Sequence, residues 1–235
     1  MASCSGKTAL VTDAAHGTGR TAAIALGKAG AQVLVHHSRR SARANAVVEE
    51  IRAAGGKAQA ICVDLVAAKG PHDLARRARA IIGERLDVLV VNALLCKTGA
   101  IEDETVAEFD AKLAANVRAP YFLIQQLLPI LSRTSSLIFT SPRAAPTPDT
   151  MPEYASAEGA IASLVAHFAP LLGPRGIRVN AIVLGAAELG PMSSAKSSER
   201  AASLVGRYRD IGSTVAFLAS HEAFLINGET VRLDS

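Results

Sequence analysis

A phenol and a carboxylate stand one helical turn apart in this chain, downstream of a serine. Tyr154 and Glu158 have the i, i+4 spacing that places two side chains on one face of a helix. A phenol exchanges protons, but its pKa starts at about 10 and a nearby carboxylate raises it further. Ser141 follows the apolar run 137–140. These three side chains are candidates for acid–base chemistry, with a phenol that is a poor base at neutral pH.

A loop containing two glycines follows the first apolar run, 9–11. Gly17 and Gly19 in a strand–loop–helix context let the backbone turn tightly and approach a pyrophosphate at the helix N-terminus. Asp13, near the start of this loop, adds bulk and negative charge. Its repulsion of a phosphate charge at about 5 Å is roughly 3 kcal/mol at an effective dielectric of about 20. Asp13 has an alternative role as the cap of the following turn.

The segment after the second apolar run, 33–35, is basic. A site specific for NAD places Asp or Glu here to accept from the ribose hydroxyls. This chain instead has Arg39 and Arg40, whose planar guanidinium groups suit the 2′-phosphate of NADP. The alternative is an ordinary solvated loop. His36 and His37 are adjacent and face opposite sides of a strand, so no metal site is predicted there.

Together these motifs resemble the short-chain dehydrogenase/reductase family over nearly the whole chain. That family has a serine at a strand end and Tyr-x-x-x-Lys opening a helix, but here Glu158 stands in place of the lysine. The resemblance implies that Tyr154 exchanges a proton with the substrate oxygen and that Ser141 holds this oxygen. It implies that Asn116 completes a proton relay through water. The expected reaction is hydride exchange between NADP(H), preferred over NAD(H), and a carbonyl or alcohol substrate.

The resemblance also implies a set of cofactor contacts spread along the chain. Asp64 corresponds to a position near the adenine, and Asn92 and Ala93 to positions at the ribose. The implied cofactor-binding residues are Asp13, His16, Gly17, Thr18, Gly19, Arg39, Arg40, Asp64, Asn92, Ala93 and Gly185. Several of the family's positions are altered, namely Asp13 and Leu94 in place of glycines, Leu184 in place of proline, and Asp234-Ser235 in place of Asp-Gly-Gly.

These departures leave two functional hypotheses open. In the first, the chain is a divergent, NADP-preferring carbonyl reductase or alcohol dehydrogenase with impaired activity. In the second, it is a non-catalytic pseudoenzyme that senses the cofactor or stabilises a partner. The change Glu158→Lys separates them, because it restores turnover only where cofactor and substrate still bind.

Short apolar runs alternate with alanine-rich helical segments along the chain, which predicts right-handed βαβ units. Runs that are apolar throughout are typical of strands buried on both faces of a parallel sheet. The expected strands are 9–11, 33–35, 60–63, 88–91, 137–139, 179–183 and 230–233, and the expected helices are 19–29, 42–54, 72–82, 105–131, 153–172 and 211–219. We therefore predict an α/β, Rossmann-type doubly wound parallel sheet in one domain over 1–235. By resemblance, the polar segment 186–209 is a shortened substrate lid.

Composition narrows the class of protein further. Hydrophobic residues make up 49% and charged residues 20%, which is ordinary for a globular chain. No apolar run reaches the roughly 18 residues of a membrane span, and the N-terminus lacks a signal-peptide layout. Three scattered cysteines favour a reducing compartment, and we expect a cytoplasmic protein. The net charge of +4 is dispersed and aromatics are only 4%, so no nucleic-acid partner is predicted.

Small residues along the predicted helix 153–172 favour close packing of that helix against another. The apolar residues Ile161, Leu164, Val165 and Phe168 stand on more than one of its faces. With the resemblance, this predicts a homodimer or homotetramer built on the helices 105–131 and 153–172.

Overall fold

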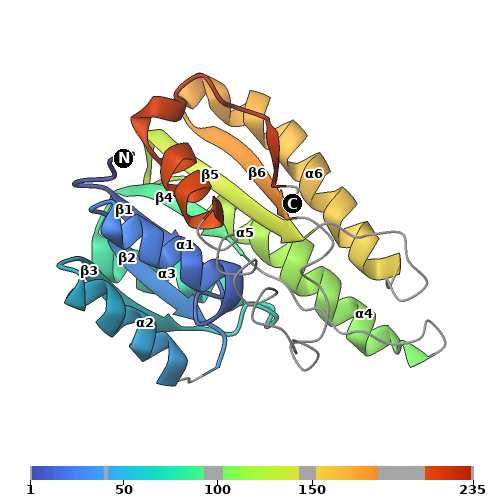
Figure 1. The fold of residues 1–235 in the computed structure, drawn as a ribbon. Coiled ribbons are helices and arrows are strands. Elements are labelled where there is room, and N and C mark those ends of the chain that lie inside the picture. Colours follow the sequence, from blue (N-terminus) through green and yellow to red (C-terminus); the bar gives the residue numbers. More distant parts are fainter. Residues whose placement is uncertain (1, 40–41, 93–102, 143–151, 185–209, 234–235) are drawn as a thin grey trace, which may run out of the picture.

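Seven parallel strands form a single sheet with helices on both faces in the computed structural model of this chain (Figure 1). It describes residues 2–39, 42–92, 103–142, 152–184 and 210–233, with the backbone alone at 142, 152–155 and 157. The strands are β1 (Thr8–Val11), β2 (Gln32–His37), β3 (Lys57–Cys62), β4 (Leu86–Val91), β5 (Leu131–Pro142), β6 (Arg178–Leu184) and β7 (Thr230–Leu233). Their order is β3-β2-β1-β4-β5-β6-β7, which confirms the predicted doubly wound sheet.

Successive residues of each interior strand divide between two cores, because side chains alternate across a sheet. In β2, Val33 and Val35 enter one core and Leu34 enters the other. The first core lies under α1 (Gly17–Lys28), α2 (Ala42–Ala53) and a helix over 210–219, and the second lies under α3 (Gly70–Ile82), α5 (Ala119–Leu127) and α6 (Pro152–Leu172).

The edge strands differ from the expected pattern of burial on both faces. β3 and β7 alternate between more and less exposed residues, whereas β4 is buried at every position. An edge strand has a neighbour on one side only and less helix cover, so it needs fewer apolar positions.

The segment predicted as one helix over 105–131 forms three successive elements. α4 (Val106–Leu113) begins at Thr105, whose side chain forms a capping box with Glu108. A π-helical segment, η2 (Ala114–Arg118), leads into α5, which ends at Leu127 rather than at residue 131. The predicted end was wrong because Pro129 cannot donate a helical hydrogen bond and its ring clashes with the preceding turn.

In the described part of the chain, no helix is both long enough and apolar enough to cross a bilayer.

Candidate active site

The candidate site begins where β1 and β4 lie side by side. The chain leaves these two central strands toward opposite sides of the sheet, which makes their carboxyl ends a topological switch point. The loop 12–16 follows β1, and Asn92 follows β4. In open α/β sheets, ligands bind in the crevice at such a point.

The loop after β1 has the tight backbone that its glycines predict. Gly17 has a φ of +52°, and a Cβ on Gly19 would lie 2.4 Å from the carbonyl oxygen of Asp13 and 2.7 Å from Nδ2 of Asn92. Asp13 itself has a φ of +46°, the one positive φ outside glycine among the described residues. Asp tolerates this region better than most residues do. The substitution has therefore left the turn intact, and the cradle still fits a closely approaching phosphate.

The side chain of Asp13 is partly buried. It lies 3.7 Å from Nε2 of His16. Burial raises the pKa of Asp13, and the neighbouring His16 and His37 lower it in part. His16 is the N-cap residue of α1, and its side chain forms no capping hydrogen bond among the described residues. Thr18 lies in the first turn of α1.

His36 holds this loop in place, a role that the sequence analysis missed. Its Nδ1 accepts a hydrogen bond from the Asp13 backbone N–H (3.1 Å), and its Nε2 donates to the Val63 carbonyl (2.8 Å). These partners fix the neutral tautomer with the proton on Nε2. Burial is the largest cause that lowers the pKa of His36, to about 4, and its side chain is 1% exposed. A polar residue inside an otherwise apolar strand was the available signal.

Asn92 is fixed by hydrogen bonds to the loop after β1 and to β5. Its backbone N–H donates to Oγ1 of Thr12 (2.7 Å), and its Oδ1 accepts from Oγ1 of Thr140 (2.6 Å). Its Nδ2 donates to the Asp13 carbonyl (3.3 Å). Asn92 therefore ties the ends of β4 and β5 to the loop after β1. Neither threonine was singled out from the sequence.

The two remaining cofactor candidates on this side are exposed. Arg39 lies beyond β2, where its carbonyl accepts from Nδ1 of His37 (2.7 Å). Asp64 follows β3 and its Oδ1 accepts from the Val66 N–H (2.9 Å), which makes a local turn. Arg40, Ala93 and Gly185 lie outside the described residues, as does the segment 186–209.

The catalytic candidates lie on the neighbouring elements of the sheet. Ser141, at the end of β5, and Glu158, on α6, line one pocket of about 150 Å³ together with Arg232 of β7. Tyr154 belongs to the first turn of α6, one turn before Glu158, and its side chain is outside the description. The structure therefore brings together Ser141 and Glu158, residues that the sequence separates.

Asn116 lies in the π-helical segment η2, which packs against α6. It is 1% exposed, and its Oδ1 is buried without a hydrogen-bond partner among the described residues. A buried acceptor of this kind is unfavourable unless something donates to it, and single π turns are frequent at functional sites. Both features fit the predicted role of Asn116 in holding a water.

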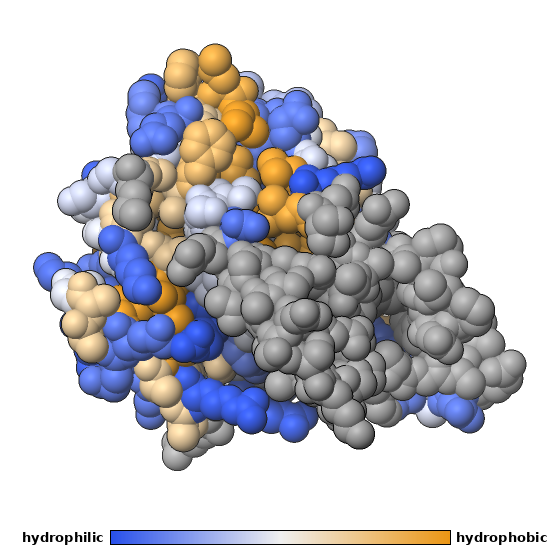
Figure 2. Space-filling model, in the orientation of Figure 1, coloured by the Kyte–Doolittle hydropathy of each residue, from blue (hydrophilic) through white to orange (hydrophobic). Residues whose placement is uncertain are grey.

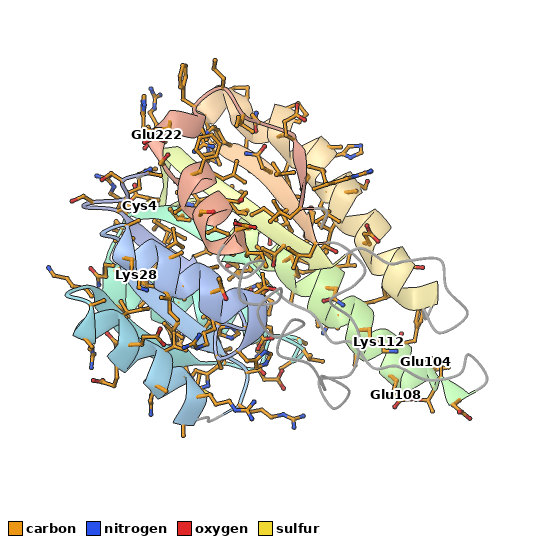
Figure 3. All side chains as sticks on the ribbon, in the orientation of Figure 1. Cys4, Lys28, Glu104, Glu108, Lys112 and Glu222 are labelled. Carbon is orange, nitrogen blue, oxygen red and sulfur yellow. The ribbon has the colours of Figure 1, made fainter. Side chains whose placement is uncertain are left out.

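A buried ion pair lies one turn before Asn116 and was not predicted. Nζ of Lys112 donates to Oε2 of Glu104 at 2.8 Å, and the two side chains are 8% and 13% exposed (Figure 3). The other carboxylate oxygen, Oε1, is buried without a partner in the described part of the chain. The pair ties the segment before α4 to α4 itself, which leads into the π-helical segment that carries Asn116.

Comparisons with known proteins bear on the family of this chain. A family model described as short chain dehydrogenase matches residues 7–201. The chain belongs to this family. It is 34% identical to versicolorin reductase 1 of Dothistroma septosporum, covering 97% of this chain and 95% of that protein. It is 30% identical to a 3-oxoacyl-[acyl-carrier-protein] reductase of Staphylococcus epidermidis, covering 97% of both chains.

Solved structures of short-chain dehydrogenases and reductases have the same fold. The angucycline C-6 ketoreductase LanV with bound NADP superposes with a TM-score of 0.85 at 32% identity, over 98% of this chain and 95% of that one. A short chain dehydrogenase of Burkholderia cenocepacia in complex with NADP superposes with a TM-score of 0.86 at 30% identity. The match covers 98% of this chain and 97% of that one.

Proposed function

We propose that this short-chain dehydrogenase is an NADP(H)-preferring oxidoreductase that interconverts a carbonyl and an alcohol, at a rate impaired by Glu158. The observation that carries the proposal is the intact turn at the switch point, where Asp13 adopts a glycine-like φ and Gly19 closes against it. The relatives are named as reductases, and two similar structures contain NADP. These names support a nicotinamide cofactor here.

The cofactor's phosphates would lie over the loop 13–19, with the adenosine 2′-phosphate near Arg39. Asn92, fixed by Thr12 and Thr140, would contact the ribose. When bound, the nicotinamide supplies or takes up the hydride.

The protein's own residues handle the oxygen and the proton. Ser141 would hold the substrate oxygen, Tyr154 would exchange its proton, and Asn116 would hold the water that leads to solvent. A cation beside Tyr154 would stabilise its phenolate, whereas the Glu158 carboxylate destabilises it. Proton exchange should therefore be slow at neutral pH, and this is the impaired step.

A direct test is calorimetric titration of the protein with NADPH and with NADH. We expect tighter binding of NADPH, and loss of that difference in Arg39→Ala together with Arg40→Ala. Equal affinities for the two cofactors in the unaltered protein, or tighter NADH, would contradict the preference.

The second candidate function is a non-catalytic, cofactor-sensing or partner-stabilising protein, favoured by carboxylates at both Asp13 and Glu158. Glu158→Lys distinguishes the two functions in an assay with a panel of ketones and NADPH. The oxidoreductase hypothesis expects turnover to rise by orders of magnitude. An unchanged, undetectable turnover in a variant that still binds NADPH would favour the second function.

We also propose that the chain acts as a homodimer or homotetramer. Four large apolar side chains of α4 and α5 are exposed, namely Val106, Phe109, Tyr121 and Phe122. The Tyr121 ring lies 5.8 Å from that of Phe168, so this surface continues onto α6. A second copy would cover it.

A further inference from the structure

A second pocket lies at the opposite end of the sheet from the candidate active site. It has a volume of about 300 Å³ and is formed near the amino ends of β1, β5 and β6. Its polar lining includes Lys7, Thr134, Arg178 and His221, and its apolar lining includes Phe224. None of the described residues that line it is acidic.

Two cations converge on this pocket from different elements. Arg178 opens β6, and its Nη2 donates to the carbonyls of Leu218 (2.7 Å) and Ser220 (3.1 Å). Nζ of Lys7 donates to the carbonyl between them, that of Ala219. The turn at the end of the helix 210–219 therefore holds an ammonium and a guanidinium side by side.

These two charges lack an acidic partner in the described part of the chain. Neither forms an ion pair there, and burial lowers the pKa of both Lys7 and Arg178. The carboxylate that acts on Lys7 is Asp87, and its oxygens already accept from Arg85 (2.9 Å), Thr8 and Ser132. Two partly buried cations that form no ion pair in the described part of the chain create a positive potential that attracts an anion.

Capping of the helix C-terminus explains only part of this arrangement. Cations are stabilising beside terminal carbonyls, and Nη2 of Arg178 and Nζ of Lys7 satisfy that role. Nη1 of Arg178, however, is buried and has no hydrogen-bond partner among the described residues. A buried donor of this kind is unfavourable, and an acceptor entering the pocket would relieve it.

We propose that this pocket is a second ligand site, which binds the phosphate group of a small phosphomonoester between Arg178 and Lys7. A guanidinium beside an ammonium is a donor set that phosphate-binding sites use. His221 and Thr134 add donors at the rim. The volume exceeds that of a phosphate, and the ring of Phe224, 60% exposed, offers an apolar wall for the organic part.

The surface around the pocket agrees with a ligand that is not wholly polar. Figure 2 shows apolar side chains gathered at the upper end of the molecule. Close in sequence to residues that line the pocket, Leu171, Phe224 and Leu225 are exposed. Glu222 follows His221 on the short helix η6 (His221–Ala223) and is not among the lining residues (Figure 3).

The test is calorimetric titration of the full chain with inorganic phosphate, phenyl phosphate and benzoate at constant ionic strength. We expect phosphate to bind, phenyl phosphate to bind more tightly, and benzoate to bind least. Lys7→Met and Arg178→Gln should each weaken phenyl phosphate by about tenfold or more, as expected when a charge-assisted hydrogen bond is lost. His221→Ala, at an exposed position, should weaken it less and keeps the test valid if the Arg178 variant fails to fold.

Two controls separate this site from the cofactor cleft. Arg39→Ala should leave phenyl phosphate binding unchanged, and the Lys7 and His221 variants should leave NADPH binding unchanged. Phosphate binding lost in Arg39→Ala but kept in Lys7→Met would place it at the cofactor site and overturn the proposal. Absence of phosphate binding, or benzoate binding more tightly than phenyl phosphate, would also overturn it.

Discussion

Replacement of His36 by phenylalanine tests the bridge that holds the loop after β1. Phenylalanine keeps the ring but cannot accept from the Asp13 N–H or donate to the Val63 carbonyl. At neutral pH the buried Val63 carbonyl and the partly buried Asp13 N–H would lose their partner, at about 1–3 kcal/mol each. We therefore expect His36→Phe to lower the free energy of unfolding by about 2–6 kcal/mol at pH 7.5.

The pH dependence of this loss follows from the pKa of His36, which burial lowers from 6.5 to about 4. The fold favours the neutral ring, so the unfolded chain binds more protons between these two values. Stability contributed by His36 is therefore complete above pH 6.5 and is lost as the pH falls toward 4. The shift corresponds to roughly 3 kcal/mol in total, of which about 2 kcal/mol is lost by pH 5.

Urea denaturation of both proteins, followed by circular dichroism at pH 7.5 and pH 5, measures the difference. The gap between the original protein and His36→Phe should shrink by about 2 kcal/mol at the lower pH, because only the original protein has the histidine to protonate. His167→Asn, at an exposed position of α6, is the matched control and should track the original protein. A gap of the same size at both pH values would refute the assignment of a buried neutral histidine.

Three further predictions concern other parts of the molecule. Asp13→Gly should tighten NADPH binding by about 1–3 kcal/mol, because it removes a carboxylate from the loop and keeps a backbone that glycine tolerates. Calorimetry at fixed ionic strength measures this change, and weaker binding would show that the Asp13–His16 contact organises the turn. Lys112→Met should destabilise the protein by about 3–5 kcal/mol in urea denaturation, since the Glu104 carboxylate stays buried without its cation. Adding Glu104→Gln should restore part of this loss. Equal stability of the single variant and the original protein would show that the pair is not buried. Light scattering at micromolar concentration should give at least twice the 24.4 kDa of one chain, and Tyr121→Glu should reduce that mass, whereas a monomeric original protein would refute the oligomer.

The sequence by itself determined the architecture of this protein, because strand and helix periodicities are local properties. Leu34 between Val33 and Val35 already indicates a strand buried on both faces, and the structure distributes these residues between two cores. The turn at Gly17 and Gly19 was predictable for the same reason, since the need for glycine arises within a few residues. The end of the long helix was not predicted correctly, although Pro129 was visible in the sequence.

The tertiary structure alone decided which polar groups meet across the sheet. His36 contacts Asp13 and Val63, which lie 23 and 27 residues away, and Thr140 contacts Asn92 across 48. Lys7 and Arg178 converge on one turn although more than half of the chain separates them from each other. Such pairings depend on strand order and register, which bring distant segments to the same end of the sheet. Hydrogen bonds and burial then set the pKa of each group. The residues next to a group in the sequence determine neither its hydrogen-bond partners nor its burial.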